Sequence, residues 1–312
     1  MRRAAGFLLG AVIAACGTTA AAQSQLVVSA GPTDSAVWVA AGDLTVAGQQ
    51  CGTSIDVQTS EGAMSSLEAL HGDGGANAAI VQADVLDYLQ SYAGQDPKIA
   101  QAVQGVELAA SLFRQELHVV ARDGVDAMGA LDGARVNLGP LTSGGFLTAT
   151  ITLDLLGIQP AEKLRLPIRE ALAALKAGDL DAVMFVDAAP SRILADAGIE
   201  PGSARLLDVE DPFLSEVYQD ASILAGTYDF DPTGARSIAV QSYLMTREVP
   251  LNTQVCNGIA DAVAMITWHR QVLATQGHAK WSDLDQSGPA LNWPLSPCAA
   301  AGLDQARQLA CR

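Results

Sequence analysis

The sequence has few aromatic residues, few positive charges and no long apolar run after its first residues. Phe, Trp and Tyr make up 5% of the 312 residues, and 18 Lys and Arg are set against 34 Asp and Glu. The net charge of −16 disfavours nucleic acid and anionic membrane surfaces as partners. Because a transmembrane helix needs roughly 20 consecutive apolar residues, none is expected after the N-terminal region.

The N-terminus has the pattern of an export signal. Met1–Arg3 is positively charged, Phe7–Ala15 is apolar but too short to span a bilayer, and Ala20–Ala22 has small side chains. This pattern predicts that residues 1–22 form a cleaved signal peptide and that the protein is periplasmic. A lipoprotein signal is the alternative, because small residues also precede Cys16.

The remaining cysteines fit an oxidising compartment, because their number is even. They are Cys51, Cys256, Cys298 and Cys311. The segment between Cys298 and Cys311 is short, which favours a bridge between those two and leaves Cys51 to pair with Cys256. Free buried thiols are the alternative. No spacing matches a C-x-x-C zinc or redox pattern, so no metal site is expected.

Segments of strand and helix character alternate along the chain. Strands are expected over Gln25–Ser29, Ser54–Thr59, Asn77–Val81, Glu116–Ala121, Arg135–Leu138, Ala182–Val186 and Arg236–Met245. Helices are expected from about Asp34 onward and over Ala63–Leu70, Val85–Tyr92, Phe146–Leu156, Glu170–Ala177 and Thr253–Thr275. The order predicts an α/β fold with mixed sheets and helices on both faces. The lack of an obvious linker favours two lobes joined by crossing strands.

A polar, glycine-rich loop precedes the predicted helix Phe146–Leu156. Its residues are Thr142, Ser143, Gly144 and Gly145. The first turn of a helix has backbone N–H groups without partners inside the helix, and glycine lets a ligand approach them. The loop is therefore predicted to bind a carboxylate, and simple capping of the helix is the alternative.

Several motifs together resemble one receptor family. The most specific are Ala110–Val120, Leu131–Gly139 and Glu170–Ala182, and short matches are Val81–Asp84 and Ala225–Tyr228. In order and spacing they resemble the TAXI proteins, the extracytoplasmic solute receptors of tripartite ATP-independent periplasmic (TRAP) transporters.

The resemblance implies a type II-like periplasmic-binding-protein fold with two lobes and crossover hinge strands. Residues 23–117 and 246–312 would form lobe one, and residues 118–245 lobe two with the crossover strands. The implied function is to bind a small carboxylate, such as glutamate or 2-oxoglutarate, and to deliver it to a TRAP-type permease. Neither catalysis nor a cofactor is implied.

Five further residues are candidates for ligand contact. Trp38 is expected to stack over a ligand or to join the core. Glu61 and Gly62 lie in a predicted loop, where Glu61 is either a cleft residue or a solvated carboxylate at the helix start. Arg169 is a candidate carboxylate partner, because arginine binds carboxylates in bidentate fashion. Asp187 follows a strand and is predicted to accept an ammonium group, which would favour an amino acid as ligand.

Two other functional interpretations stay open at this point. Leu141–Gly145 nearly matches the G-x-S-x-G motif of serine hydrolases, but Leu replaces the first Gly and the base would have to be a distant histidine. A receptor that presents its ligand to a sensor, without transport, has the same sequence pattern. Asp229–Gly234 resembles the start of a calcium loop but lacks its acidic end, and a turn is expected there.

Overall fold

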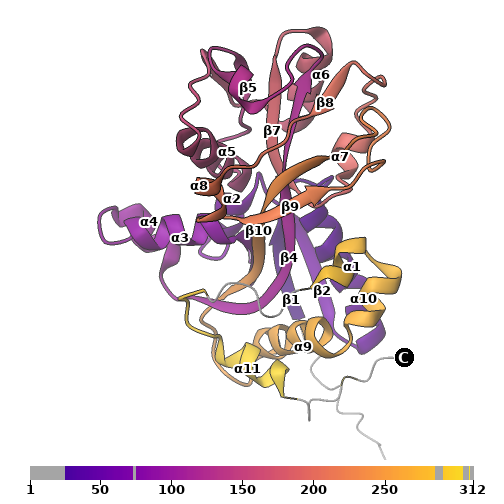
Figure 1. Ribbon diagram of the computed structural model, residues 1–312. Coiled ribbons are helices and arrows are strands. Elements are labelled where there is room, and N and C mark those ends of the chain that lie inside the picture. The colour runs from indigo at the N-terminus through magenta and orange to yellow at the C-terminus, as the bar shows by residue number, and fades with distance from the viewer. Residues whose placement is uncertain (1–24, 73–74, 285–290, 305–308, 310–312) are drawn as a thin grey trace, which may run out of the picture.

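The computed structural model describes residues 25–72, 75–284, 291–304 and 309 (Figure 1). The predicted signal peptide, Cys16 and Cys311 lie outside the described residues. Within these ranges the chain forms a mixed α/β structure around one ten-stranded sheet, as predicted. No helix in the same ranges is both long enough and apolar enough to cross a membrane.

The first part of the chain forms parallel strands with helices beside them. The strands are β1 (Gln25–Ala30), β2 (Ser54–Thr59) and β3 (Ala78–Gln82), and β1 pairs with both others. The helices are α1 (Ala36–Cys51), α2 (Ala63–Glu68), α3 (Ala83–Tyr92) and α4 (Pro97–Val103). The Ser35 hydroxyl caps the start of α1 by accepting the Trp38 N–H, and Gly52 ends it with a φ of 78°.

Two long antiparallel strands, β4 (Val106–Arg122) and β10 (Ala235–Arg247), run through both halves of the molecule (Figure 1). Phe113 packs in an apolar core of the first half, and Leu117 packs in a core of the second half. The molecule therefore has two lobes, with β4 passing from one to the other. The strand is longer than the predicted Glu116–Ala121, because residues 106–115 pair with β10.

The second lobe is built on β7, which pairs with β4. Its elements are η1 (Met128–Leu131), β5 (Arg135–Asn137), α5 (Gly144–Leu155), β6 (Glu162–Leu164), α6 (Ile168–Ala177), β7 (Ala182–Asp187), α7 (Arg192–Ala195), β8 (Ala204–Leu206), α8 (Pro212–Ser215) and β9 (Gln219–Ile223). The strand order across the sheet is β2-β1-β3-β10-β4-β7-β5-β6, with β8 beside β4 and β9 beside β10.

The C-terminal part returns to the first lobe. Its elements are α9 (Gln254–Trp268), α10 (Arg270–Gln276), η2 (Ala279–Asp283) and α11 (Pro297–Leu303). The single helix predicted over Thr253–Thr275 is wrong, because the chain turns at His269 and a second helix begins. The turn lets Leu273 pack into the same core as α1 and α9.

The predicted disulfide pairing is also wrong. Cys256 in α9 is bonded to Cys298 in α11, with their Cα atoms 5.1 Å apart. Cys51 is disulfide-bonded as well. The prediction relied on closeness along the chain, whereas the packing of α11 on α9 joins cysteines 42 residues apart.

Candidate ligand-binding cleft

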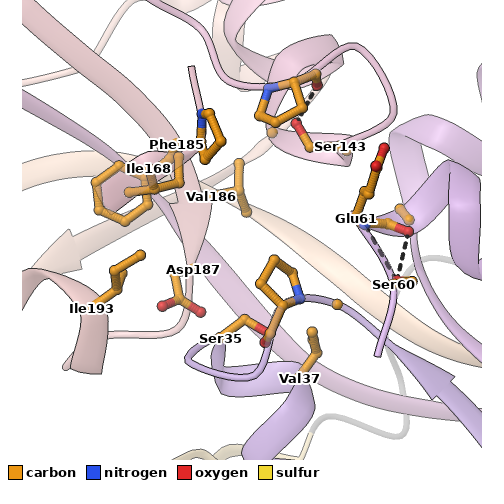
Figure 2. A pocket seen from close by; sticks show the side chains of 18 of the residues that line it. Ser35, Val37, Ser60, Glu61, Ser143, Ile168, Phe185, Val186, Asp187 and Ile193 are labelled. Carbon is orange, nitrogen blue, oxygen red and sulfur yellow. Dashed lines mark hydrogen bonds between the residues drawn. The ribbon is translucent and has the colours of Figure 1, made fainter. Parts of the chain in front are cut away.

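A cavity of about 680 Å³ is lined by residues of both lobes. Most lining residues come from segments 31–37, 59–63 and 80–82 of the first lobe and 138–145, 165–170 and 185–187 of the second, and Gln115 of β4 and Ile193 of α7 complete the lining. These segments are mostly strand ends and helix starts, where backbone groups without partners converge. Figure 2 shows the side chains around this cavity. Its size is within the usual range for small-molecule sites, about 300–1,000 Å³.

The start of α5 supplies backbone donors to the cavity. The Ser143 hydroxyl caps the helix by accepting the Phe146 N–H at 3.2 Å, and Ser143, Gly144 and Gly145 all line the cavity. Among the hydrogen bonds of the described residues, none uses the N–H of Gly144 or Gly145. Gly145 also lets α5 approach β7, because a Cβ there would lie 3.1 Å from the Val186 nitrogen.

The two lobes touch beside the start of α5. A Cβ on Gly62 would lie 2.7 Å from the Ser143 Cα, and the φ of 147° at Gly62 is one that only glycine adopts readily. Thr142 does not line the cavity, but its hydroxyl donates to Glu61 at 2.9 Å and its carbonyl accepts the Met64 N–H. Glu61, Gly62 and Thr142 therefore hold this side of the cleft closed.

Gln82 is a cavity residue that the sequence interpretation missed. The residue is 8% exposed, and the buried Oε1 of its amide makes no hydrogen bond with the described residues. It lies against α5, because a Cβ on Gly144 would overlap the Gln82 Oε1. A polar residue that ends an otherwise apolar buried strand, β3, was the available signal. A buried amide without a partner is costly unless a ligand or water satisfies it.

Asp187 lines the cavity from the end of β7 and is 3% exposed. Its carboxylate accepts the Ala36 N–H at 2.9 Å and the Ser191 hydroxyl at 2.6 Å. Burial raises the pKa of Asp187 to about 6, and these hydrogen bonds offset part of the effect. The predicted ammonium partner is thus already a cap for the start of α1, although two carboxylate oxygens have lone pairs to spare.

A series of buried hydrogen bonds continues from Asp187 through Ser191 and Tyr228 to His118. The Tyr228 hydroxyl accepts the Ser191 N–H and lies 2.8 Å from His118 Nε2, so its own proton is donated to the histidine. His118 Nδ1 then donates to the Glu116 carbonyl. Burial lowers the pKa of His118 to about 4, and the ring is neutral at physiological pH. His118 is therefore a buried histidine whose two ring nitrogens both have hydrogen-bond partners.

The cationic side chains that line the cavity are Arg165 and Arg169. Arg169, the predicted carboxylate partner, donates through Nε to Asp34 of the first lobe at 2.5 Å. The Arg165 guanidinium lies 5.6 Å from the centre of the Phe146 ring. Both cations already have interactions with the protein.

Other candidates lie elsewhere. Trp38 packs against the first-lobe core and is not a lining residue, so its position gives the stacking prediction no support. The Ser143 hydroxyl donates to the Pro140 carbonyl, and none of the described lining residues is a histidine. Asp231 accepts from Thr233 within a turn, as expected. The described residues contain no His, Cys, Asp and Glu group suited to a metal ion.

Comparison with known proteins supplies the family. The model of the NMT1-like family matches residues 27–254. The chain belongs to the NMT1-like family. No curated protein matches this NMT1-like chain.

Solved structures similar to this NMT1-like chain show its fold. It is similar to a periplasmic transporter at a TM-score of 0.53 and 16% identity, over 82% of this chain and 89% of the other. It is similar to the periplasmic binding protein BugD at a TM-score of 0.51 and 11% identity, over 80% of this chain and 85% of the other. It is similar to MatC from Rhodopseudomonas palustris with bound malate at a TM-score of 0.50 and 16% identity, over 80% of this chain and 86% of the other. The fold is that of two-lobed periplasmic binding proteins, as predicted.

Proposed function

We propose that this chain is an extracytoplasmic solute receptor that binds a small carboxylate in the cleft and delivers it to a TRAP-type permease. The start of α5 is the observation that carries the proposal. The N–H groups of Gly144 and Gly145 have no described acceptor and lie on a cavity between two lobes. A carboxylate placed there accepts both hydrogen bonds and meets the positive end of the helix dipole.

Further features support the biological setting. The motifs at Ala110–Val120 and Glu170–Ala182 favour the TAXI type of receptor. The NMT1-like family and the periplasmic neighbours favour an exported binding protein over an enzyme. In the proposal, a lobe of residues 23–117 and 246–312 closes on a lobe of residues 118–245.

The proposed contacts follow from the lining of the cavity. Gln82 joins the predicted residues that line the cavity, which are Glu61, Gly62, Ser143, Gly144, Gly145, Arg169 and Asp187. Glutamate and 2-oxoglutarate are the first candidates that the resemblance offers. Asp187 is the group that would favour the amino acid, since its remaining lone pairs can accept an ammonium group.

A thermal-shift screen of the exported chain against carboxylates and amino acids tests the proposal. A ligand that binds the folded state raises the melting temperature as its concentration increases. Isothermal titration calorimetry then gives the dissociation constant, and uptake through a TRAP-type permease encoded beside this gene should require the receptor. Ester hydrolysis that Ser143→Ala abolishes would instead show an enzyme.

A further inference from the structure

The two ends of the cavity differ in chemistry. Ser60, Glu61 and Ser143 lie on one side of the close-up in Figure 2, and Ile168, Phe185 and Ile193 lie on the other. The apolar side is continuous with a core of the second lobe, in which Phe185 and Ile193 are buried and against which Ile168 packs. The cavity thus has a polar end and an apolar end.

The polar end is built to hold one charged group. The free N–H groups of Gly144 and Gly145 provide donors, and the unpartnered amide of Gln82 lies against the same turn of α5. Gln82 is more than nine-tenths buried, so a ligand is its natural partner when the cleft is closed. Rotation of the Gln82 amide about its terminal bond presents its NH2 group in place of Oε1, so a single carboxylate can accept from that group and from both glycine N–H groups.

The charged residues that line the cavity are mostly acidic, which disfavours a second carboxylate at the apolar end. Arg169 is paired with Asp34, and Arg165 lies over the Phe146 ring. The acidic lining residues are Asp34, Glu61, Glu170 and Asp187. Asp187 lines the cavity with Ile193 and is hydrogen-bonded to Ser191, two residues before Ile193, so a ligand carboxylate near Ile193 would meet a like charge as well as apolar side chains.

We propose, on the basis of the receptor function above, that the ligand is a monocarboxylate whose remainder is apolar and branched or aromatic. Its carboxylate binds to the start of α5 and Gln82. Its apolar part packs against Ile168, Phe185 and Ile193. This class replaces glutamate and 2-oxoglutarate, the candidates that the resemblance offers, because the second carboxylate of such diacids would occupy the apolar end.

Two matched ligand pairs test this assignment by calorimetry. Leucine and glutamate share an amino acid head, and 4-methyl-2-oxopentanoate and 2-oxoglutarate share a 2-oxo acid head. Within each pair only the end of the side chain changes, from a branched alkyl group to a carboxylate. The alkyl member should bind about tenfold more tightly or better in at least one pair.

Cavity variants connect that preference to the apolar end. Ile168→Ala should remove most of the difference within the pair, whereas Ile199→Ala should keep it, because Ile199 packs on the same core without lining the cavity. Gln82→Met should weaken both members of the pair by about tenfold, because it removes the amide from the shared head site.

The possible outcomes separate the two proposals. Equal or tighter binding of the diacids overturns the ligand class and leaves a carboxylate receptor in place. Failure of all four ligands to bind at millimolar concentration, with the chain folded by circular dichroism, overturns both proposals. If the alkyl members bind more tightly and Ile168→Ala does not reduce that difference, the assignment of the apolar end is also overturned.

Discussion

The Asp187 carboxylate accepts a hydrogen bond of 2.9 Å from the backbone N–H of Ala36. Asp187 ends β7 of the second lobe, and Ala36 begins α1 of the first. The chain thus places its own anion at the start of α1, where the helix dipole favours negative charge. At the start of α5, by contrast, the N–H groups of Gly144 and Gly145 have no described acceptor, and the proposed carboxylate site lies there.

The pH dependence of stability should report on Asp187. Its pKa is raised to about 6 in the folded protein, from about 3.9 when unfolded. The folded state therefore binds more protons between these values, so the stabilising contribution is complete below pH ~4 and is lost as pH rises through ~6. Relative to Asp187→Asn, the wild-type free energy of unfolding should fall by about 2–3 kcal/mol from pH 4 to 7. Urea unfolding at several pH values measures this difference.

Asp181 provides a control of opposite sign. Hydrogen bonds from Arg135 and Arg122 hold the pKa of Asp181 well below its usual range, so its contribution is lost as pH falls. Asp181→Asn should therefore reduce stability at pH 7 and leave the loss between pH 4 and 7 in place. If Asp187→Asn follows the same pH curve as the wild type, the carboxyl of Asp187 does not titrate as its burial implies.

Gly144→Ala should separate the start of α5 from Gln82. The new methyl group would overlap the Gln82 Oε1, so the amide must leave its place at the cavity. Carboxylate affinity should fall by about tenfold, since one charged hydrogen bond is worth ~1.5–3 kcal/mol. Calorimetry with the best ligand of the panel measures the loss.

Gly42→Ala is the matched control for that substitution. A Cβ on Gly42, inside α1, meets no atom within 4 Å. The change should stabilise the protein by about 0.5–1 kcal/mol through helix propensity and leave affinity unchanged. An affinity in Gly144→Ala equal to that of Gly42→Ala would show that the Gln82 amide does not contact the ligand.

Asp34→Asn should change ligand preference by releasing Arg169. The ion pair is partly exposed, so its loss should cost less than about 1 kcal/mol of stability. The freed guanidinium can then bind a second carboxylate in the cleft. The affinity ratio of 2-oxoglutarate to 4-methyl-2-oxopentanoate should rise by about three- to tenfold. Any effect of the substitution on lobe closure changes both affinities equally and therefore leaves their ratio unchanged. A ratio equal to that of the wild type would contradict the prediction.

Removing the bridge between α9 and α11 should destabilise the first lobe. The bond joins positions 42 residues apart, for which the loop-entropy model gives about 4 kcal/mol. The double substitution Cys256→Ala and Cys298→Ala should lower the free energy of unfolding by about 2–4 kcal/mol in denaturant titrations. Neither residue lines the cavity, so the folded variant should keep the wild-type affinity.

Local patterns in the sequence predicted much of the fold. The strand Ser54–Thr59 has the predicted bounds, and β7 and α3 differ from prediction by one and two residues. These elements follow from the spacing of apolar residues along a short segment, and that spacing can be read directly from the sequence. The capped glycine loop before α5 was also visible, because capping depends on residues three apart.

Contacts between distant segments could not be predicted in the same way. The full length of β4 depends on pairing with β10, and the bond of Cys256 to Cys298 depends on α11 packing against α9. The position of Gln82 at the proposed site depends on the packing of α5 against it. The position of Trp38, packed against the first-lobe core, was likewise decided by its neighbours in space.

The sequence alone therefore determined the α/β class, most elements and the capped, glycine-rich start of α5, where we propose that an anion binds. The tertiary structure decided which groups remain available to a ligand there. Asp187 accepts a hydrogen bond from Ala36, and Arg169 donates one to Asp34, through contacts that join segments more than 130 residues apart. Hydrogen-bonding capacity is set by the residue type, but whether it is already used depends on which distant groups folding brings within reach.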